Sequence, residues 1–249
     1  MRVFVLTENG LPKNINCAVA WYGFREMGFE VVGYSQPSEL EAATRSDIVV
    51  GGIGLCQLVM RRFGVEVPRI NYPDTLKTYL GRRLWTSTIN RVNNDVESWP
   101  VFVKPVQDKK FTGVVVRSTR DLIGCGTSGE DAEVICSEVV SFDSEWRCFV
   151  RYGEILDIRR YNGSWRRSFD PRVVEDMVAA YLDAPAGYAI DIGVTSRGET
   201  LLVEVNDGYA LGSYGLQQNL YAQLLNARWS QLMGVEDELA YIGRHGLPD

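Results

Sequence analysis

Apolar runs alternate with helical patterns along the first third of the chain. Residues 3–6 form one apolar run, and FEVVGY and DIVVGG form two more. Helical patterns cover residues 14–27, 38–44 and 55–63, and glycines follow the first and the last of them. Glycine directly after the last helical residue is a common helix terminator. Buried strands that alternate with helices predict a small parallel α/β lobe.

The pattern changes after residue 100, where short runs of strand-forming residues are separated by turns. These runs are VFVKP, TGVVVRS, AEVICSEVV, WRCFVRYG, EILDIRRYN, AIDIGVTS and ETLLVEVN. A Ser-Arg-Gly turn at residues 196–198 joins the last two and favours a hairpin. Helical patterns cover residues 75–84, 171–182 and 216–233. We therefore predict a larger, mainly antiparallel α+β region after the first lobe.

Composition narrows the class of protein. The chain is 45% hydrophobic and 23% charged, which is typical of a globular protein. Its net charge of −6 argues against a protein whose main function is to bind nucleic acid. No apolar run approaches the roughly 20 residues that span a bilayer. Five scattered cysteines and a single histidine, His245, argue against a zinc site or a disulfide framework. We expect a cytoplasmic protein without membrane contact.

Two carboxylates and an amide lie on the last two strand runs. Asp191 stands in AIDIG, and Glu204 and Asn206 stand in VEVN. Residues two apart on a strand point to the same face, and the hairpin brings Asp191 beside them. Oxygen ligands of this kind suit Mg²⁺. From these residues alone the pattern leaves two interpretations open: a solvated polar sheet face, which is slightly favoured, and a magnesium site.

Lysines and arginines supply candidate phosphate contacts. Lys104 ends an apolar strand run, where an ammonium group needs an anionic partner such as phosphate. Lys109 and Lys110 follow in a turn, which suits either phosphate contact or solvent. Arg147 and Arg159 lie on neighbouring strand runs and are expected to face the same side, with the next residue after Arg159 facing away.

The segment SEVVSFDSEWR leads out of one strand run and into the next. Glu138 and Glu145 lie seven residues apart across it. The main chain of such a connector can pair with the edge of an adenine, and a carboxylate beyond it can accept from ribose hydroxyl groups. Taken alone, Glu145 is better interpreted as an exposed loop acid.

The order of these residues resembles the ATP-grasp superfamily. The steps of thirteen residues from Asp191 to Glu204 and seven from Glu138 to Glu145 are similar to those of the D-alanine–D-alanine ligase branch. The KFTG turn resembles a small subgroup of that superfamily. The resemblance implies an N-terminal α/β domain over residues 1–72 and an ATP-grasp domain over 73–249. That domain has two subdomains, 73–140 and 141–249, with mainly antiparallel sheets.

The resemblance also implies a role for each candidate residue, with ATP and Mg²⁺ as cofactors. Lys104, Lys109 and Lys110 would contact the phosphates. The hinge would begin at Glu138, where the main chain of Val139 and Ser141 would bind the edge of adenine and Glu145 would bind the ribose. Asp191, Glu204 and Asn206 would hold magnesium. Ala189 stands where the ligase branch usually has an arginine. Arg147 or Arg159 is therefore expected to stabilise the transferred phosphoryl group.

The reaction that the resemblance implies is ATP-dependent ligation. A substrate carboxylate attacks the γ-phosphate, and an amine then displaces phosphate from the acylphosphate. An ATP-dependent kinase of a small molecule or peptide and a non-catalytic ATP-binding sensor are the alternatives. Substrates are expected to be a small molecule or peptide with a carboxylate, and an amine. Candidate substrate contacts lie in residues 8–16 and 207–217, with Tyr209, Ser213 and Tyr214. The sequence does not predict the oligomeric state, and a homo-oligomer is one of the states that it allows.

Overall fold

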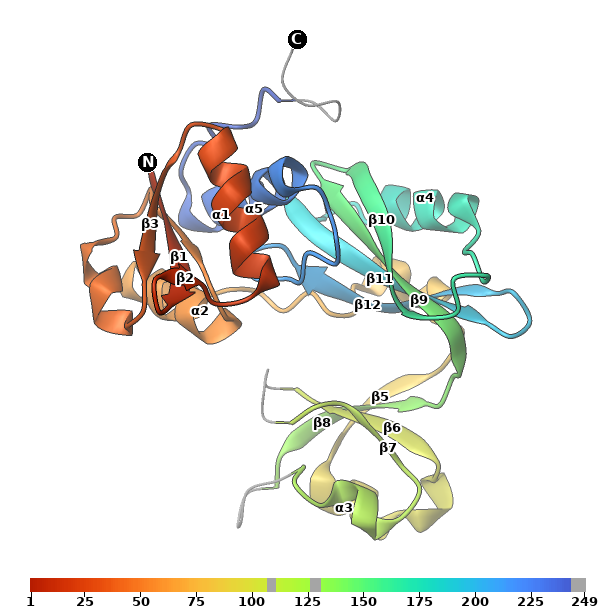
Figure 1. Cartoon of the computed structure of the whole chain (residues 1–249). Helices are drawn as coiled ribbons and strands as arrows, with labels where there is room; N and C mark the ends of the chain where they lie inside the picture. The colour runs from red at the N-terminus through yellow and green to blue at the C-terminus, as the bar shows by residue number, and fades with distance from the viewer. Residues whose placement is uncertain (107–110, 126–130, 243–249) are drawn as a thin grey trace. The chain divides into compact units, whose positions relative to one another are not determined.

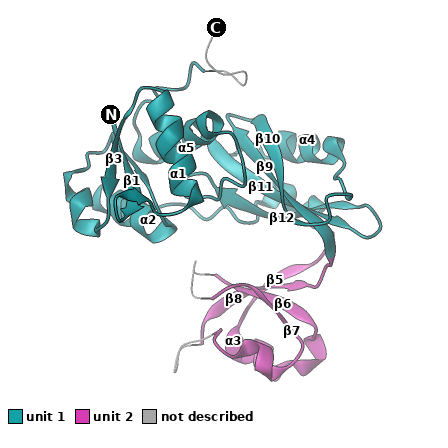
Figure 2. Ribbon diagram, in the orientation of Figure 1, with its two compact units in different colours: residues 1–79, 142–249 teal, residues 80–141 magenta. Residues whose placement is uncertain are grey.

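The computed structural model describes residues 1–106, 111–125 and 131–242. The chain divides into two compact units (Figure 2): residues 1–79 together with 142–249 form unit 1, and residues 80–141 form unit 2. In this division the N-terminal segment clusters with the C-terminal half of the chain. The predicted domain boundaries at 72/73 and 140/141 stay predictions.

Unit 1 begins with a small α/β layer (Figure 1). Strand β1 (Arg2–Glu8) lies between β3 (Glu30–Tyr34) and β4 (Ile48–Val50) and runs parallel to both, while the short β2 (Leu11–Pro12) pairs antiparallel with the end of β1. The connections are α1 (Ile15–Glu26), the 3₁₀ helix η1 (Pro37–Ala42) and α2 (Ile53–Arg62). The predicted parallel lobe is confirmed, and its three helices lie within two residues of the predicted bounds.

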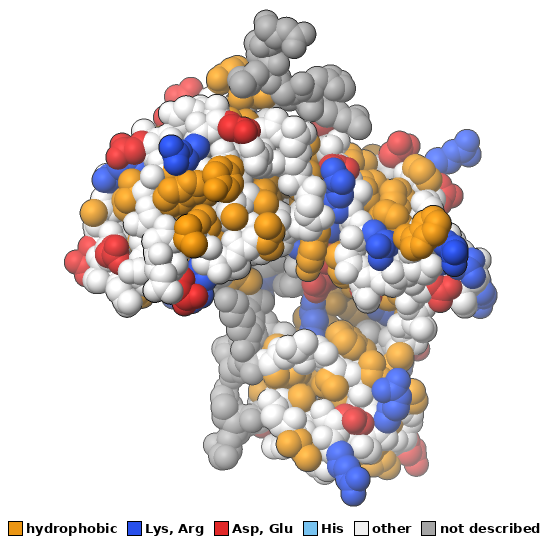
Figure 3. Space-filling view, viewed as in Figure 1, with side chains coloured by type: hydrophobic (Ala, Val, Ile, Leu, Met, Phe, Trp, Pro, Cys, Tyr) orange, Lys and Arg blue, Asp and Glu red, His pale blue; other side chains and the backbone are white. Residues whose placement is uncertain are grey.

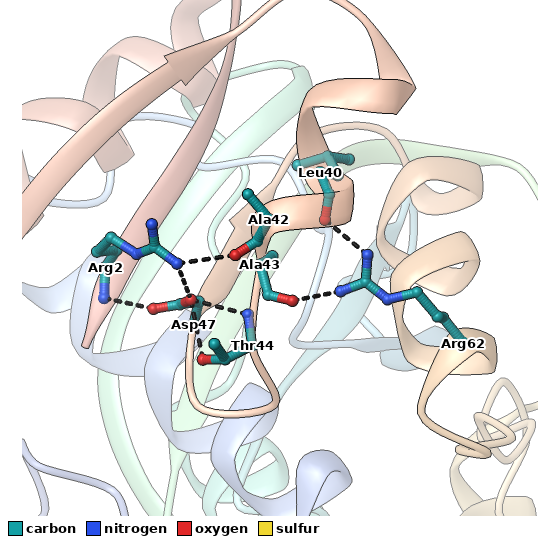
Figure 4. A network of polar contacts seen from close by, with 7 residues as sticks. All are labelled: Arg2, Leu40, Ala42, Ala43, Thr44, Asp47 and Arg62. Atoms are coloured by element: carbon teal, nitrogen blue, oxygen red, sulfur yellow. Dashed lines mark hydrogen bonds and ion pairs between the residues drawn. The ribbon is translucent and has the colours of Figure 1, made fainter.

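A polar network fixes the loop between η1 and β4 (Figure 4). The buried carboxylate of Asp47 accepts from the main-chain N–H and guanidinium of Arg2 at 2.8 Å, and from the N–H and hydroxyl of Thr44 at 2.8 and 2.9 Å. From α2, Arg62 donates to the carbonyls of Leu40 and Ala43. These bonds tie the loop to β1 and α2 where backbone carbonyls would otherwise lack partners.

The second sheet of unit 1 is antiparallel throughout. Its strands are β9 (Phe142–Arg151), β10 (Glu154–Gly163), β11 (Gly187–Thr195) and β12 (Thr200–Asp207), in the order β10-β9-β11-β12. Helix α4 (Pro171–Ala180) covers the face that carries Tyr188, whose ring meets that of Tyr181 edge-on at 5.3 Å. The predicted hairpin of β11 and β12 and the helix over 171–182 are confirmed.

Helix α5 (Gln218–Met233) joins the two layers of unit 1. Leu224 and Leu225 of α5 share one buried core with Phe149 of β9 and with Phe24 of α1. The crossing of α1 and α5 is close, since a Cβ atom on Gly23 would lie 2.1 Å from the carbonyl oxygen of Gln218. This packing explains why residues 1–79 cluster with 142–249.

Unit 2 is a four-stranded antiparallel sheet with helix α3 (Ile89–Asn94). The strand order is β5-β8-β6-β7, formed by β5 (Leu84–Thr88), β6 (Val101–Pro105), β7 (Val114–Val116) and β8 (Glu133–Glu138). The 3₁₀ helices η3 (Val96–Ser98) and η4 (Thr119–Leu122) lie between strands. Valines at 101, 103, 116 and 134 fill its core.

One predicted element is wrong. The helix expected over residues 75–84 is instead the 3₁₀ helix η2 (Asp74–Tyr79), and strand β5 begins at Leu84. Aromatic and β-branched residues in the sequence LWTST favour a strand once β8 is available to pair with it. Among the described residues, no helix is both long enough and apolar enough to cross a bilayer. All five cysteines are buried thiols, as expected of small core residues.

Candidate active site

A row of four charged side chains crosses the second sheet of unit 1. Arg159 on β10 pairs with Arg147 on β9, Arg147 with Asp191 on β11, and Asp191 with Glu204 on β12. Directly opposed residues of antiparallel strands point to the same face, so the four side chains share one face. Asn206 pairs with Ala189 in the next row on that face. The register therefore gathers the three oxygen-bearing residues that the sequence singled out.

Arg147 and Asp191 form a buried, two-pronged ion pair. The Nε and Nη2 atoms of Arg147 each donate to one oxygen of Asp191 at 2.7 Å, and the two residues are only 6% and 3% exposed. The amide nitrogen of Asn206 donates to the same carboxylate at 3.0 Å. Burial is the largest influence on the pKa of Asp191 and raises it to about 6, while the guanidinium of Arg147 acts in the opposite direction.

Two stacked tyrosines surround the guanidinium of Arg147. The rings of Tyr161 and Tyr214 stack at 5.0 Å, and the Arg147 guanidinium lies 4.8 Å from the Tyr214 ring and 5.9 Å from the Tyr161 ring. The loop before α5 thus lies over the ion pair.

Glu145 is held by two donors from β10. The hydroxyl of Tyr161 donates to one of its oxygens at 3.0 Å and the amide of Asn162 to the other at 2.6 Å. Burial raises the pKa of Tyr161 far above its ordinary value, so this hydroxyl stays a donor. Glu145 is half-buried rather than a solvated loop acid.

The two segments predicted to contact substrate are joined to each other. The side-chain oxygen of Asn16, in the first turn of α1, accepts from both the N–H and the hydroxyl of Ser213, at 2.9 and 3.0 Å. The amide of Gln57 on α2 also donates to the hydroxyl of Tyr209 at 2.9 Å. Residues 207–217 are therefore positioned by the N-terminal layer.

Arg159 and Arg160 differ in the face that they occupy. Arg159 pairs with Arg147 and forms an exposed ion pair with Asp157 at 2.5 Å, whereas Arg160 pairs with Trp146 on the opposite face. This is the register predicted from strand alternation. The role of Arg159 in chemistry stays a prediction.

The donor set around Asp191 suits a hard divalent cation. Oδ1 of Asp191 has a lone pair beyond the one that Arg147 uses, whereas Oδ2 accepts from both Arg147 and the amide nitrogen of Asn206. The amide oxygen of Asn206 is the atom that a cation would take. In the described part of the chain, no group of three or more His, Cys, Asp and Glu side chains could hold a metal. An ion here would take two carboxylates and an amide, with phosphate and water completing its shell as Mg²⁺ prefers.

The remaining predicted site residues lie in unit 2 or at its end. Lys104 is half-buried on β6, beside Phe102 on the face away from the valine core. The Glu138 carboxylate, at the end of the inner strand β8, accepts from the main-chain N–H of Arg83 at 2.9 Å. Val139 and Ser141 are exposed residues between β8 and β9. Lys109 and Lys110 lie outside the described residues.

Several solved structures share this fold at low sequence identity. D-alanine–D-alanine ligase from Bacillus anthracis complexed with ATP is 15% identical, with a TM-score of 0.56, and the match covers 93% of this chain and 97% of that one. L-amino acid ligase from Bacillus licheniformis is 11% identical, with a TM-score of 0.58, and the match covers 97% and 77% of the two chains. The ATP-grasp ligase PsnB complexed with minimal precursor, Mg and ADP is 12% identical, with a TM-score of 0.50, over 92% and 96%.

The family of the chain follows from its sequence. Among curated proteins, no relative matches at a significant level. A family model described as ATP-grasp domain, R2K clade family 2, matches residues 79–224, which is more than half of the chain and includes both Lys104 and the row on β9 to β12. The chain belongs to this ATP-grasp family.

Proposed function

We propose that the protein is an ATP-dependent ligase that activates a carboxylate as an acylphosphate for attack by an amine. ATP and Mg²⁺ are its cofactors, and an amino acid or a peptide supplies the carboxylate. The observation that supports this most is the row of Arg147, Asp191 and Glu204 with Asn206 beside it, in a chain of the ATP-grasp family. In this row the guanidinium of Arg147 and three oxygen-bearing side chains lie on one face of the sheet.

We propose nucleotide contacts for residues of each unit. In unit 2, Lys104, Lys109 and Lys110 contact phosphates, and the hinge from Glu138 onward offers the main chain of Val139 and Ser141 to adenine. In unit 1, Glu145 accepts from the ribose. Tyr161 and Asn162 support this role, because both hold the Glu145 carboxylate in one orientation.

The chain contributes positioning and charge rather than a covalent intermediate. Asp191, Glu204 and Asn206 would hold Mg²⁺, which would supply positive charge to the phosphate groups of ATP. Arg147 holds Asp191 in place through two hydrogen bonds and leaves Nη1 directed at the Gly212 carbonyl, 3.5 Å away. Arg159, on the same face and half-exposed, is the arginine better able to reach a transferred phosphoryl group.

The substrate carboxylate is proposed to bind near the loop of residues 207–217. Asn16 fixes Ser213, and Tyr214 presents a ring that is 47% exposed above Arg147. A partly exposed, hydrogen-bonded loop next to Arg147 and Asp191 is suited to orient an acyl group for attack. A kinase that stops at phosphoryl transfer would use the same residues, so the amine distinguishes the two reactions. A cytoplasmic location stays a prediction.

Product analysis tests this function. Purified protein is incubated with Mg·ATP and a panel of amino acids and peptides, with and without added amines, and ADP release and products are measured by mass spectrometry. A ligase gives ADP, phosphate and a product joined by an amide bond, only when an amine is present or when the carboxylate substrate carries one. A stable phosphorylated product favours the kinase. Nucleotide binding without any ADP release across the panel favours the sensor.

A further inference from the structure

An exposed tryptophan lies on the turn between β10 and α4. Trp165 is 70% exposed, and the guanidinium of Arg166 lies over its ring at 5.0 Å. The turn has the sequence GSWRR, residues 163–167. A large ring left in water beside a cation carries a hydrophobic surface whose burial would be favourable.

The main chain of this turn is anchored to β9. The N–H of Ser164 donates to the Asp143 carbonyl at 2.8 Å, and the Arg167 carbonyl accepts from the hydroxyl of Ser144 at 2.8 Å. Gly163 has a φ of 73°, and a Cβ atom there would lie 2.1 Å from the Asp143 carbonyl oxygen. The turn therefore holds Trp165 outward, so a partner that buries the ring need not order the loop first.

The turn also carries positive charge that has no acidic partner. Five arginines lie between residues 159 and 172. Two of them are paired, Arg159 with Asp157 and Arg167 with Asp143. In the described part of the chain, no ion pair involves the other three, which are Arg160, Arg166 and Arg172. Arg160 donates to the Gly163 carbonyl at 2.6 Å, so its guanidinium lies at the start of the same turn.

Arg160 lies on the opposite side of the sheet from the candidate site. Arg160 pairs with Trp146, and the Trp146 ring meets Phe169 edge-on at 5.2 Å, next to α4. Where β10 and α4 lie in Figure 1, Figure 3 shows several Lys and Arg side chains around hydrophobic ones, with acidic side chains among them. Occupation of the surface therefore needs neither ATP nor Mg²⁺.

We propose that Trp165, with Arg160 and Arg166, is a docking surface for an acidic peptide segment that also carries an apolar side chain. Carboxylates pair with the two arginines, and the apolar side chain covers the Trp165 ring, which is the type of residue that dominates interface energies. Nucleic acid fits less well. The protein carries a net charge of −6, and two arginines neutralise few phosphates. A short peptide senses mainly the local charge, because salt screens the rest within about 10 Å.

Selection from a random peptide library tests the proposal without catalysis. The wild-type protein, immobilised without nucleotide, selects peptides, and the dissociation constants of the enriched peptides are measured by fluorescence anisotropy at two salt concentrations. The test variants are Trp165→Ala, Trp165→Phe and the charge reversal Arg166→Glu. Matched controls are Tyr22→Ala and Arg25→Glu, an exposed aromatic residue and an exposed arginine on α1. Thermal melting checks that each variant is folded.

The expected peptides combine Asp or Glu with an aromatic or large aliphatic residue and bind more weakly at high salt. Trp165→Ala and Arg166→Glu should each weaken binding about tenfold or more, Trp165→Phe should retain most of it, and the α1 controls should bind as wild type does. The proposal is overturned if no peptide is enriched, if enriched peptides lack acidic residues, or if the α1 variants lose as much affinity as the Trp165 variant. Preferential binding of a single-stranded RNA over the enriched peptides would also overturn it.

Discussion

At the residue scale, Arg147 and Asp191 form a buried ion pair that stabilises the fold, a role that the sequence did not predict. Both are buried, so removing the arginine leaves a carboxylate without its partner in a medium of low polarity. We expect Arg147→Ala to lower the free energy of unfolding by about 3–5 kcal/mol. Arg159→Ala breaks only an exposed ion pair and should cost less than about 1 kcal/mol.

Urea unfolding of the two variants measures this difference. The double variant Arg147→Ala/Asp191→Asn should recover part of the loss, since it removes the unpaired charge. Equal stability of Arg147→Ala and Arg159→Ala would show that the buried pair contributes nothing. Kinetic effects of Arg147 substitutions have meaning only in variants shown to be folded, whereas Arg159→Ala gives a direct test of the predicted role in phosphoryl transfer.

Glu204 allows a cleaner test of the proposed metal site. It is half-buried at the end of the row, and Glu204→Gln preserves its size. We expect the variant to lose ADP release while its melting temperature without ligand stays near that of the wild type. Activity is measured over a range of Mg²⁺ concentrations. Near-normal turnover across that range would rule out Glu204 as a ligand.

At the scale of elements, two asparagines at the start of α1 form different contacts: one caps the helix, and the other binds the loop before α5. Asn14 caps the helix by accepting from the N–H of Cys17 at 3.0 Å, whereas Asn16 accepts from Ser213 in the loop before α5. We expect Asn16→Ala to raise the KM of the acyl substrate about tenfold with little change in the KM of ATP, since an interaction used for substrate positioning is lost.

Hydrogen exchange provides a readout apart from activity. The amide of Ser213 should exchange faster in Asn16→Ala. Asn14→Ala is the matched control, because it should cost about 1 kcal/mol of helix stability and leave the loop amide protected. If both variants affect the loop alike, the effect arises from α1 as a whole and the tether has no separate role.

The network around Asp47 predicts a pH dependence of the N-terminal layer. Burial alone would raise the pKa of Asp47, but hydrogen bonds from Arg2 and Thr44 outweigh it and lower the pKa to about 2. Because this pKa lies below the unfolded value of about 4, the carboxylate stabilises the fold above that pH, and the contribution is lost as the pH falls toward 2. Asp47→Asn should be destabilised by about 1–3 kcal/mol at neutral pH.

Urea unfolding from neutral pH down to about pH 3 tests this linkage. The gap between wild type and Asp47→Asn should narrow as the pH falls, since protonation removes from the wild type the charge that the variant lacks. A gap that stays constant across this range would mean that the charge of Asp47 is unimportant.

Local patterns were sufficient for some of the elements and not for others. The strands of the first layer are apolar runs, and the positions of Asp191, Glu204 and Asn206 follow from the period of two along a strand and one hairpin. Strand β5 was missed because its partner β8 lies about fifty residues further along the chain. Sequence alone also could not give the ion pair of Arg147 with Asp191, because it depends on the pairing of β9 with β11.

At the scale of the whole molecule, the two ends of the chain meet within unit 1, which the sequence pattern alone could not predict. Residues 1–79 and 142–249 cluster through the packing of α1 on α5, a contact between the two ends of the chain. The register irregularity between Arg160 and Asn162 also falls beside Tyr161, and this aromatic contact of Arg147 had no signal in the sequence.

Ligand binding should stabilise the whole protein if the nucleotide contacts are correct. A ligand that binds only the folded state at about 100 times its Kd adds about 2.7 kcal/mol to the free energy of unfolding. We expect saturating ATP with Mg²⁺ to raise the melting temperature and Lys104→Ala to reduce that shift, because the lysine supplies positive charge to phosphates from a half-buried strand position. Lys77→Ala is the matched control, since Lys77 is exposed and paired with Asp74 at 2.6 Å. Should wild type show no shift, or Lys104→Ala shift as much as Lys77→Ala, the assignment of Lys104 to the phosphates is wrong.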